Sequence, residues 1–190
     1  MKFRTILIDP PWEQPLMRQR KRKHGMPGKT LPYPTMGLEE IKNLPVREMA
    51  EAGSHLWLWT TNAFLRDGFD CMSAWGFKYL APITWHKPSG VGNYFVHVTQ
   101  TILFGYFERC QFNLERYLPT FFDGLPGIHS AKPKESYQLI ERISDPERLE
   151  LFARPWSLMF PVRHGWHVWG NEVESDVEFG EINARILLSS

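Results

Sequence analysis

The stretch Ile6-Leu7-Ile8-Asp9-Pro10-Pro11-Trp12 decides the fold, because an apolar run stops there at an acid, two prolines and an indole. The run from residue 3 to residue 8 lacks the strict alternation of a half-exposed strand, which predicts a buried strand of a parallel or mixed sheet. Proline cannot extend a central strand, so the strand is expected to end at Asp9. Ligands of open α/β sheets bind beyond the carboxyl ends of the strands, and this corner is therefore the expected functional site.

The corner combines hydrogen-bond acceptors with an aromatic face. The Asp9 carboxylate and the carbonyls of Pro10 and Pro11 only accept, since proline has no backbone N–H. The Trp12 indole offers a face on which a planar ring can stack. A planar heterocycle with an exocyclic amine, such as adenine or cytosine, would satisfy this set. The alternative is a structural turn with a half-buried tryptophan, which an Asp-Pro-Pro sequence on its own favours.

Residues 9 to 12 resemble the DPPW signature of the N6-adenine methyltransferase family that includes the catalytic subunit of the eukaryotic messenger-RNA adenosine methyltransferase. Other family motifs follow in the family's order along nearly the whole chain. They are Pro32-Tyr33-Pro34-Thr35-Met36, Leu56-Trp57-Leu58-Trp59, Ser130 to Pro133, Ile140-Glu141-Arg142, Glu150 to Pro155, and Gly170-Asn171. The resemblance implies a Rossmann-like α/β fold with the permuted, β-class motif order, S-adenosyl-L-methionine as cofactor, and adenine in nucleic acid as substrate.

The composition is that of a globular protein. The chain has 190 residues, of which 43% are hydrophobic and 14% aromatic, so we expect one methyltransferase domain over residues 1–190. Cys71 and Cys110 fit neither a disulfide framework nor a metal-ligand spacing, which favours a reducing, cytoplasmic location and no metal. Neither a signal peptide nor a membrane span is expected. The net charge of +1 does not by itself indicate a nucleic-acid partner.

The expected elements alternate between helices and strands, which predicts an α/β sheet. Glycine and proline positions set most of the boundaries, because Gly76 is expected to close a helix and Pro133 to open one. We predict helices over 38–52, 63–75 and after Pro133, strands over 54–61, 77–85, 96–107, 118–122, 149–153 and 165–169, and loops over 13–37 and from 86 to 90.

The loop over residues 13–37 is basic and rich in proline and glycine, and no acid follows Glu13 within it. Its cationic run is expected to contact phosphates, the alternative being a solvated tail. The residues that we assign to substrate binding there are Arg20, Lys21, Arg22 and Lys23. By the resemblance, Tyr33 is a second stacking or gating ring for a flipped base, rather than a packed cap. Lys87 resembles a family lysine on the substrate side, the alternative being an exposed strand-end lysine.

Cofactor residues are expected at the later strand ends. Lys132 precedes a helix, where backbone N–H groups and an ammonium both favour an anion. The resemblance implies that Lys132 holds the cofactor carboxylate and that Asp9 also belongs to the cofactor site. The ribose is assigned to Arg154, Ser157, Asn171 and Glu172, with Asn171 able to donate and accept at once. The sequence departs from the family pattern at Gln100, Ala131, Trp156, Ser157 and Glu172, and the roles of Gln100 and of the Trp156-Ser157 pair stay open.

The expected reaction is methyl transfer to the exocyclic amine of adenine. Asp9 and the Pro10 carbonyl would accept the two amine hydrogens, while Trp12 and Tyr33 replace the lost base stacking. The missing G-x-G-x-x-G argues against NAD chemistry, and the missing H-x-E with P-C-x-x-C argues against a zinc deaminase.

Two alternatives stay open, a scaffold of the same fold that binds nucleic acid without catalysis, and an RNA adenosine methyltransferase. DNA is favoured over RNA because the chain looks like the short bacterial and phage members of the family, which are mostly regarded as DNA-modifying. The small domain favours a homodimer, since it offers little surface to nucleic acid.

Overall fold

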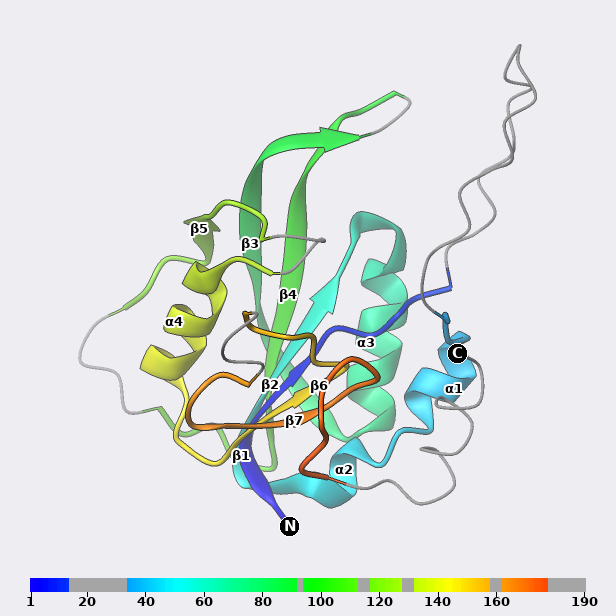
Figure 1. The fold of residues 1–190 in the computed structure, drawn as a ribbon. Coiled ribbons are helices and arrows are strands. Elements are labelled where there is room, and N and C mark those ends of the chain that lie inside the picture. Colours follow the sequence, from blue (N-terminus) through cyan, green and yellow to red (C-terminus); the bar gives the residue numbers. More distant parts are fainter. Residues whose placement is uncertain (14–33, 92–93, 113–116, 128–131, 158–161, 178–190) are drawn as a thin grey trace.

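The computed structural model describes residues 1–13, 34–91, 94–112, 117–127, 132–157 and 162–177. Within these residues one seven-stranded sheet forms the centre of the molecule, with the strand order β5-β3-β4-β2-β1-β6-β7 (Figure 1). The strands are β1 Phe3–Ile8, β2 Ala50–Thr60, β3 Phe77–Val91, β4 His97–Phe107, β5 Phe121–Asp123, β6 Arg148–Leu151 and β7 Trp166–Trp169.

Strand direction places the expected corner at a shared edge. Strand β1 lies between β2 and β6 and is parallel to both, and β6 is parallel to β7. Only β4 runs against its neighbours β2 and β3, while β5 is parallel to β3. The carboxyl ends of the other six strands therefore point to one edge, which Asp9 joins directly after β1. The mixed sheet confirms the predicted Rossmann-like α/β fold.

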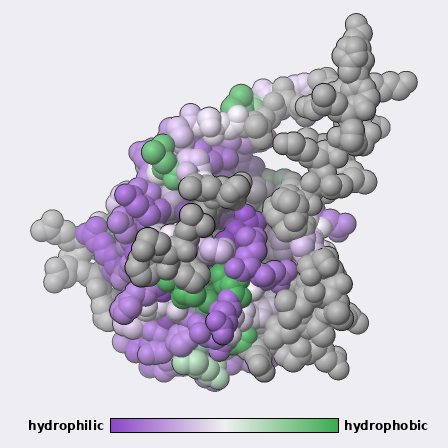
Figure 2. Space-filling view, viewed as in Figure 1, coloured by the Kyte–Doolittle hydropathy of each residue, from purple (hydrophilic) through white to green (hydrophobic). Residues whose placement is uncertain are grey.

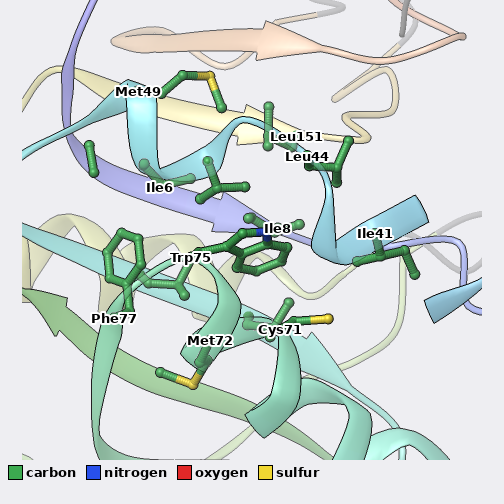
Figure 3. Packing of buried hydrophobic residues seen from close by; sticks show 14 of the residues in the cluster. Ile6, Ile8, Ile41, Leu44, Met49, Cys71, Met72, Trp75, Phe77 and Leu151 are labelled. Carbon is green, nitrogen blue, oxygen red and sulfur yellow. The ribbon is translucent and has the colours of Figure 1, made fainter. Parts of the chain in front are cut away.

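Helices cover both faces of the sheet. Figure 1 shows α3 (Leu65–Ala74) on one side and α4 (Lys134–Ile143) on the other, with α1 (Leu38–Lys42) and α2 (Val46–Met49) near α3 and the 3-10 turn η1 (Asn62–Phe64) leading into it. Side chains along each strand alternate between the two faces of the sheet, so one strand contributes to the hydrophobic clusters on both faces. Ile6 and Ile8 of β1 pack toward α1 and α3, where Figure 3 shows Trp75 close to Ile8 and Met72, whereas Leu7 packs with the residues of α4.

Most of the predicted helices and strands are confirmed with small shifts, but residues 50–52, predicted as the end of a helix, begin strand β2. Helix α3 ends before Gly76, whose φ of +77° is the left-handed conformation that glycine adopts without strain. Pro133 is the N-cap residue of α4 rather than its first helical residue. Strand β6 stops at Leu151, because Phe152 has a φ of +61° and leaves the extended conformation.

The predicted loop over residues 86–90 is wrong. Strand β3 continues through it to Val91 and pairs with β4 as far as His97. Pro88 is tolerated because β5, the other neighbour of β3, pairs only as far as His86, so that Pro88 lies at a free edge and within a register irregularity. Sequence signals that break an isolated strand are here overridden by the pairing partner.

The surface in the view of Figure 2 is mostly hydrophilic, with hydrophobic colour gathered in one area low in the view and in small spots near its upper edge. Among the described residues, none of the helices is long and apolar enough to cross a membrane.

Candidate active site at the end of strand β1

An ion pair joins the end of β1 to the start of α4. Lys132 Nζ lies 3.0 Å from Asp9 Oδ1, and the two side chains are 15% and 34% exposed. Residues far apart in sequence therefore meet where the topology places the carboxyl edge. The partial exposure of Asp9 leaves its carboxylate open to a second partner, so the pair is a candidate reaction centre rather than a sealed structural bridge.

The Lys132 ammonium also faces an aromatic ring and an amide. Its Nζ lies 4.7 Å from the centroid of the Trp59 ring and 3.5 Å from Gln100 Oε1. Trp59 is 1% exposed and meets Trp85 edge to face. An ammonium has three donors, so Lys132 can hold Asp9 and a further acceptor together.

Sequence reasoning did not assign Trp59 or Gln100 to this site. Strand register brings Trp59 to the site, because Trp59 comes directly after Leu58, which pairs with Ile8, just as Asp9 comes directly after Ile8. Alternation along β2 then places Trp59 on the α4 face of the sheet, with Leu7 and Trp57.

Backbone hydrogen bonds fix the diproline corner. The Pro10 carbonyl accepts from Trp12 N at 2.8 Å, and the Pro11 carbonyl accepts from Met36 N at 2.9 Å. Glu13 N in turn donates to the Met36 carbonyl, so that the corner pairs with the segment that enters α1. A carbonyl oxygen has two lone pairs, and the Pro10 carbonyl therefore keeps acceptor capacity for one more donor.

Trp12 is mostly enclosed by the protein. Its side chain is 6% exposed, its ring stacks on Phe64 at a centroid distance of 5.4 Å, and its Nε1 donates to the Trp59 carbonyl at 3.3 Å. These contacts brace the corner against β2 and η1. Little of the ring is left for stacking on a base, which is the role that the sequence predicted for it.

The ends of β6 and β7 approach each other closely. A Cβ built on Gly170 would lie 2.3 Å from the Ala153 carbonyl oxygen, so only glycine fits there. The residues that follow, Arg154 and Glu172, place Nε and Oε1 3.9 Å apart. Asn171 is exposed between Gly170 and Glu172. The structure thus brings Arg154 and Glu172 together beyond the ends of β6 and β7, with Asn171 beside Glu172 in sequence, and β6 adjoins β1. Ser157 is exposed farther along the segment that follows β6.

A second carboxyl group lies behind the ion pair. Tyr137 of α4 donates its O–H to Glu150 Oε1 at 2.7 Å. Burial raises the pKa of Glu150 to about 7, an increase that the negative charge of Asp9 assists and that the Tyr137 hydrogen bond, Lys132 and Arg163 oppose. Burial, with Glu150 next in importance, also holds the pKa of Tyr137 well above its ordinary value.

The Glu150 carboxyl makes stability fall as pH rises. Its pKa is higher in the folded protein than in the unfolded chain, so the cost of burial is absent below about pH 4.5 and complete above about pH 7. Glu150→Gln keeps an acceptor for Tyr137 but removes the titrating group. We expect the free energy of unfolding of this variant, relative to that of the native protein, to be about 2 kcal/mol higher at about pH 8 than at about pH 5. Urea unfolding at both pH values measures this.

Glu141→Gln is the matched control. The hydrogen bond from Arg163 lowers the pKa of Glu141, so the stability that this carboxylate contributes is already present above about pH 4.5, and the deficit of the variant against the native protein should stay nearly constant from about pH 5 to about pH 8. Parallel pH profiles for the native protein and Glu150→Gln would contradict the expected protonation of Glu150.

The acid of the Ile140-Glu141-Arg142 motif holds α4 to the segment before β7. Arg163 Nε and Nη2 donate to Glu141 at 2.6 and 2.8 Å, and Trp166 Nε1 donates to it at 2.8 Å. The Arg163 guanidinium also lies over the Trp156 ring, 4.6 Å from its centroid. The Trp156 departure is therefore part of a packed cation–π contact beside Tyr137.

The predicted substrate residues are placed unevenly. Lys87 comes two residues after Trp85 on β3, and alternation therefore places it on the α4 face of the sheet, the face on which Lys132 meets Trp59. Burial lowers the pKa of Lys87, and the positive charge of Lys132 adds to this. Tyr33 and the cationic residues Arg20, Lys21, Arg22 and Lys23 lie outside the described residues.

The family model MT-A70 matches residues 3–172, a span that begins at β1 and contains both partners of the Asp9–Lys132 pair. The chain belongs to the MT-A70 family. Among curated proteins, the human N(6)-adenosine-methyltransferase catalytic subunit METTL3 is 27% identical over 187 residues, which cover 91% of this chain and 28% of METTL3. A Drosophila melanogaster MT-A70-like N(6)-adenosine-methyltransferase is 28% identical over 184 residues, 91% of this chain and 27% of the relative.

A third relative belongs to a different functional type. The Arabidopsis thaliana non-catalytic subunit MTB of an N6-adenosine-methyltransferase is 34% identical over 87 residues, 45% of this chain and 10% of MTB. This MT-A70 chain spans less than a third of the length of each of these relatives.

Proposed function

We propose that this MT-A70 chain transfers a methyl group from S-adenosylmethionine to the exocyclic N6 amine of adenine in nucleic acid, with DNA as the polymer. The observation that carries the proposal is the half-exposed Asp9 carboxylate held 3.0 Å from Lys132 at the carboxyl edge of the sheet. Asp9 is the acceptor for the amine, and Lys132 orients it from the cofactor side.

The residues at this edge fit the cofactor. Lys132 stands before α4, whose N-cap residue Pro133 has no side-chain acceptor to cap the helix, so a cofactor carboxylate can bind both the ammonium and the helix N-terminus. Arg154, Asn171 and Glu172, with Ser157 beyond them, supply donors and acceptors for ribose hydroxyls. When bound, S-adenosylmethionine supplies an electrophilic methyl group on a sulfonium.

Asp9 and Pro10 activate the amine by accepting its hydrogens. The lone pair of an adenine amine is delocalised into the ring, which makes the nitrogen a poor nucleophile. Asp9 accepts one N–H and the remaining lone pair of the Pro10 carbonyl accepts the other, which favours the tetrahedral nitrogen of the transition state. Positioning the nitrogen within roughly 3–3.5 Å of the methyl carbon supplies much of the rate. Asp9 then takes the proton that the methylated nitrogen releases.

The adenine reaches this corner by leaving its stack, at a cost of a few kcal/mol in a duplex. Tyr33 supplies the ring that receives the base, and Trp12, through Phe64 and the Trp59 carbonyl, keeps the acceptor corner in place. The cationic run from Arg20 to Lys23 contacts phosphates, and Lys87 adds a charge close to the corner.

Two other functions have support from the relatives. The names of the human and Drosophila proteins contain adenosine, which favours RNA as the polymer. The similarity to MTB favours a scaffold that binds nucleic acid without catalysis. The Asp9–Lys132 pair argues against a non-catalytic scaffold. A protein that catalyses no reaction does not need a partly exposed carboxylate beside a lysine that can bind the cofactor.

Mass spectrometry of nucleosides separates the three functions. The purified protein is incubated with S-adenosylmethionine carrying a deuterated methyl group and with DNA or RNA of the same sequence. We expect labelled N6-methyldeoxyadenosine from DNA in excess of labelled N6-methyladenosine from RNA. Label in RNA alone would reassign the polymer, and cofactor binding by calorimetry without label in either polymer would establish the scaffold.

A further inference from the structure

The β3–β4 hairpin extends far beyond the edge that carries Asp9. The pairs Ile8–Leu58, Leu58–Leu103 and Leu103–Pro82 place Ile102 and Ile83 level with Asp9. Strand β4 begins at His97, and at roughly 3.3 Å per residue the segment from His97 to Ile102 spans about 17 Å. Figure 1 shows this hairpin rising above the rest of the sheet.

The end of the hairpin exposes three apolar side chains in a row. Tyr94, Phe95 and Val96 are 90%, 79% and 63% exposed. Two adjacent aromatic rings in water forgo the burial that normally stabilises them, and exposed apolar groups of this kind mark contact surfaces.

The charge of the hairpin suits a polyanion. Residues 77–107 contain no Asp or Glu, although the chain has 21 acids, and they contain Lys78, Lys87, His86 and His97. The acid Asp123 of β5 is engaged with His86, with Oδ1 2.8 Å from Nδ1. A strand of phosphates therefore meets no repelling carboxylate along either strand of the hairpin.

The part of the hairpin that extends beyond Asp9 is braced on both sides. On the β5 side, the His86–Asp123 contact is joined by Trp85 Nε1, which donates to the Gly124 carbonyl at 2.8 Å. On the η1 side, Asn62 Nδ2 lies 3.0 Å from His97 Nδ1. These contacts fix the direction in which the hairpin leaves the sheet, and so the distance between its tip and Asp9.

We propose that Tyr94 and Phe95 stack on an unpaired base of the nucleic-acid substrate, about five nucleotides from the adenine at Asp9. This rests on the proposed function, and it adds a contact outside the reaction centre. At a rise of about 3.4 Å per stacked nucleotide, the distance of about 17 Å along the strand from the level of Asp9 to His97 corresponds to about five nucleotides, and Tyr94 and Phe95 lie just beyond His97. Stacking on aromatic rings tolerates any base, so the contact adds affinity without reading sequence.

A nucleic-acid strand fits the tip better than a second protein does. A stable protein interface buries about 800 Å² on each partner. The two rings supply about 150–250 Å² each, which is too little for such an interface but is enough for one base between or upon them.

The test is a length series measured by fluorescence anisotropy without cofactor. Labelled single strands of DNA, and in parallel of RNA, carry one adenine and reach about three or about ten nucleotides to either side. The native protein is expected to bind the long strand at least about tenfold more tightly. The double variant Tyr94→Ala/Phe95→Ala should lose this gain in both polymers and bind the short strand as the native protein does.

Tyr79→Ala is the matched control, because Tyr79 is an exposed aromatic residue near the start of β3, at the opposite edge of the sheet from the hairpin tip. It should keep the full gain. Equal gains in the native protein and the double variant would overturn the inference while leaving methyl transfer intact. Sedimentation of the double variant as a monomer beside a native dimer would also overturn it, in favour of a second copy at the tip. Failure of the native protein to bind any strand would overturn both proposals.

Discussion

Asp9→Asn lowers the rate of methyl transfer by about a thousandfold, while cofactor binding falls far less. Asparagine keeps the size of the side chain, but its amide offers one neutral acceptor and adds donors toward an amine that itself donates. Loss of a preorganised group aimed at the transition state typically costs a factor of about 10²–10³. Single-turnover kinetics with labelled S-adenosylmethionine measures the chemical step, and calorimetry measures the cofactor affinity.

Asp145→Asn is the matched control for this variant. Asp145 is 34% exposed, like Asp9, and its Oδ2 lies 2.8 Å from Arg4 Nη2 in an ion pair before β6 begins, at the amino edge of the sheet. It should retain the native rate. An Asp9→Asn enzyme with an undiminished single-turnover rate would contradict the acceptor role of Asp9 and with it the proposed mechanism.

The location of the site could be predicted from the sequence because local chemistry determines it. The prolines at 10 and 11 end β1, and the end of a buried parallel strand is where α/β sheets bind ligands. Lys132 could be found in the same way, since it stands before a helix with an apolar face. Their meeting at 3.0 Å required the strand order and could not be read from local signals alone.

The surroundings of the ion pair could not be predicted, because they depend on long-range register. The contact of Trp59 with Lys132 follows from the alignment of β2 with β1, and the brace formed by Trp12 follows from the position of Phe64. An indole at a strand end is equally suited to stack on a ligand or to pack on a neighbour, and only tertiary contacts decide between them. Glu150 lies near the ion pair because β6 pairs with β1 and places it opposite Leu7, and its bond to Tyr137 depends on how α4 packs on the sheet.

Lys132→Met weakens S-adenosylmethionine binding by about 10- to 100-fold. A hydrogen bond to a charged group contributes about 1.5–3 kcal/mol, and methionine keeps the apolar stem of lysine but loses its charge and donors. The Asp9 carboxylate also loses its ion-pair partner, so the rate of transfer at saturating cofactor should fall further. Calorimetry gives the affinity, and thermal unfolding verifies that the variant folds.

Lys134→Met is the matched control, because Lys134 is an exposed residue in the first turn of α4, two positions beyond Lys132. It leaves the same helix N-terminus in place and should bind the cofactor as the native protein does. If both lysine variants weaken binding equally, the effect comes from the general positive potential of this edge. If only Lys132→Met weakens binding, the Lys132 ammonium binds the cofactor directly, because the two variants then differ in the loss of a single close contact.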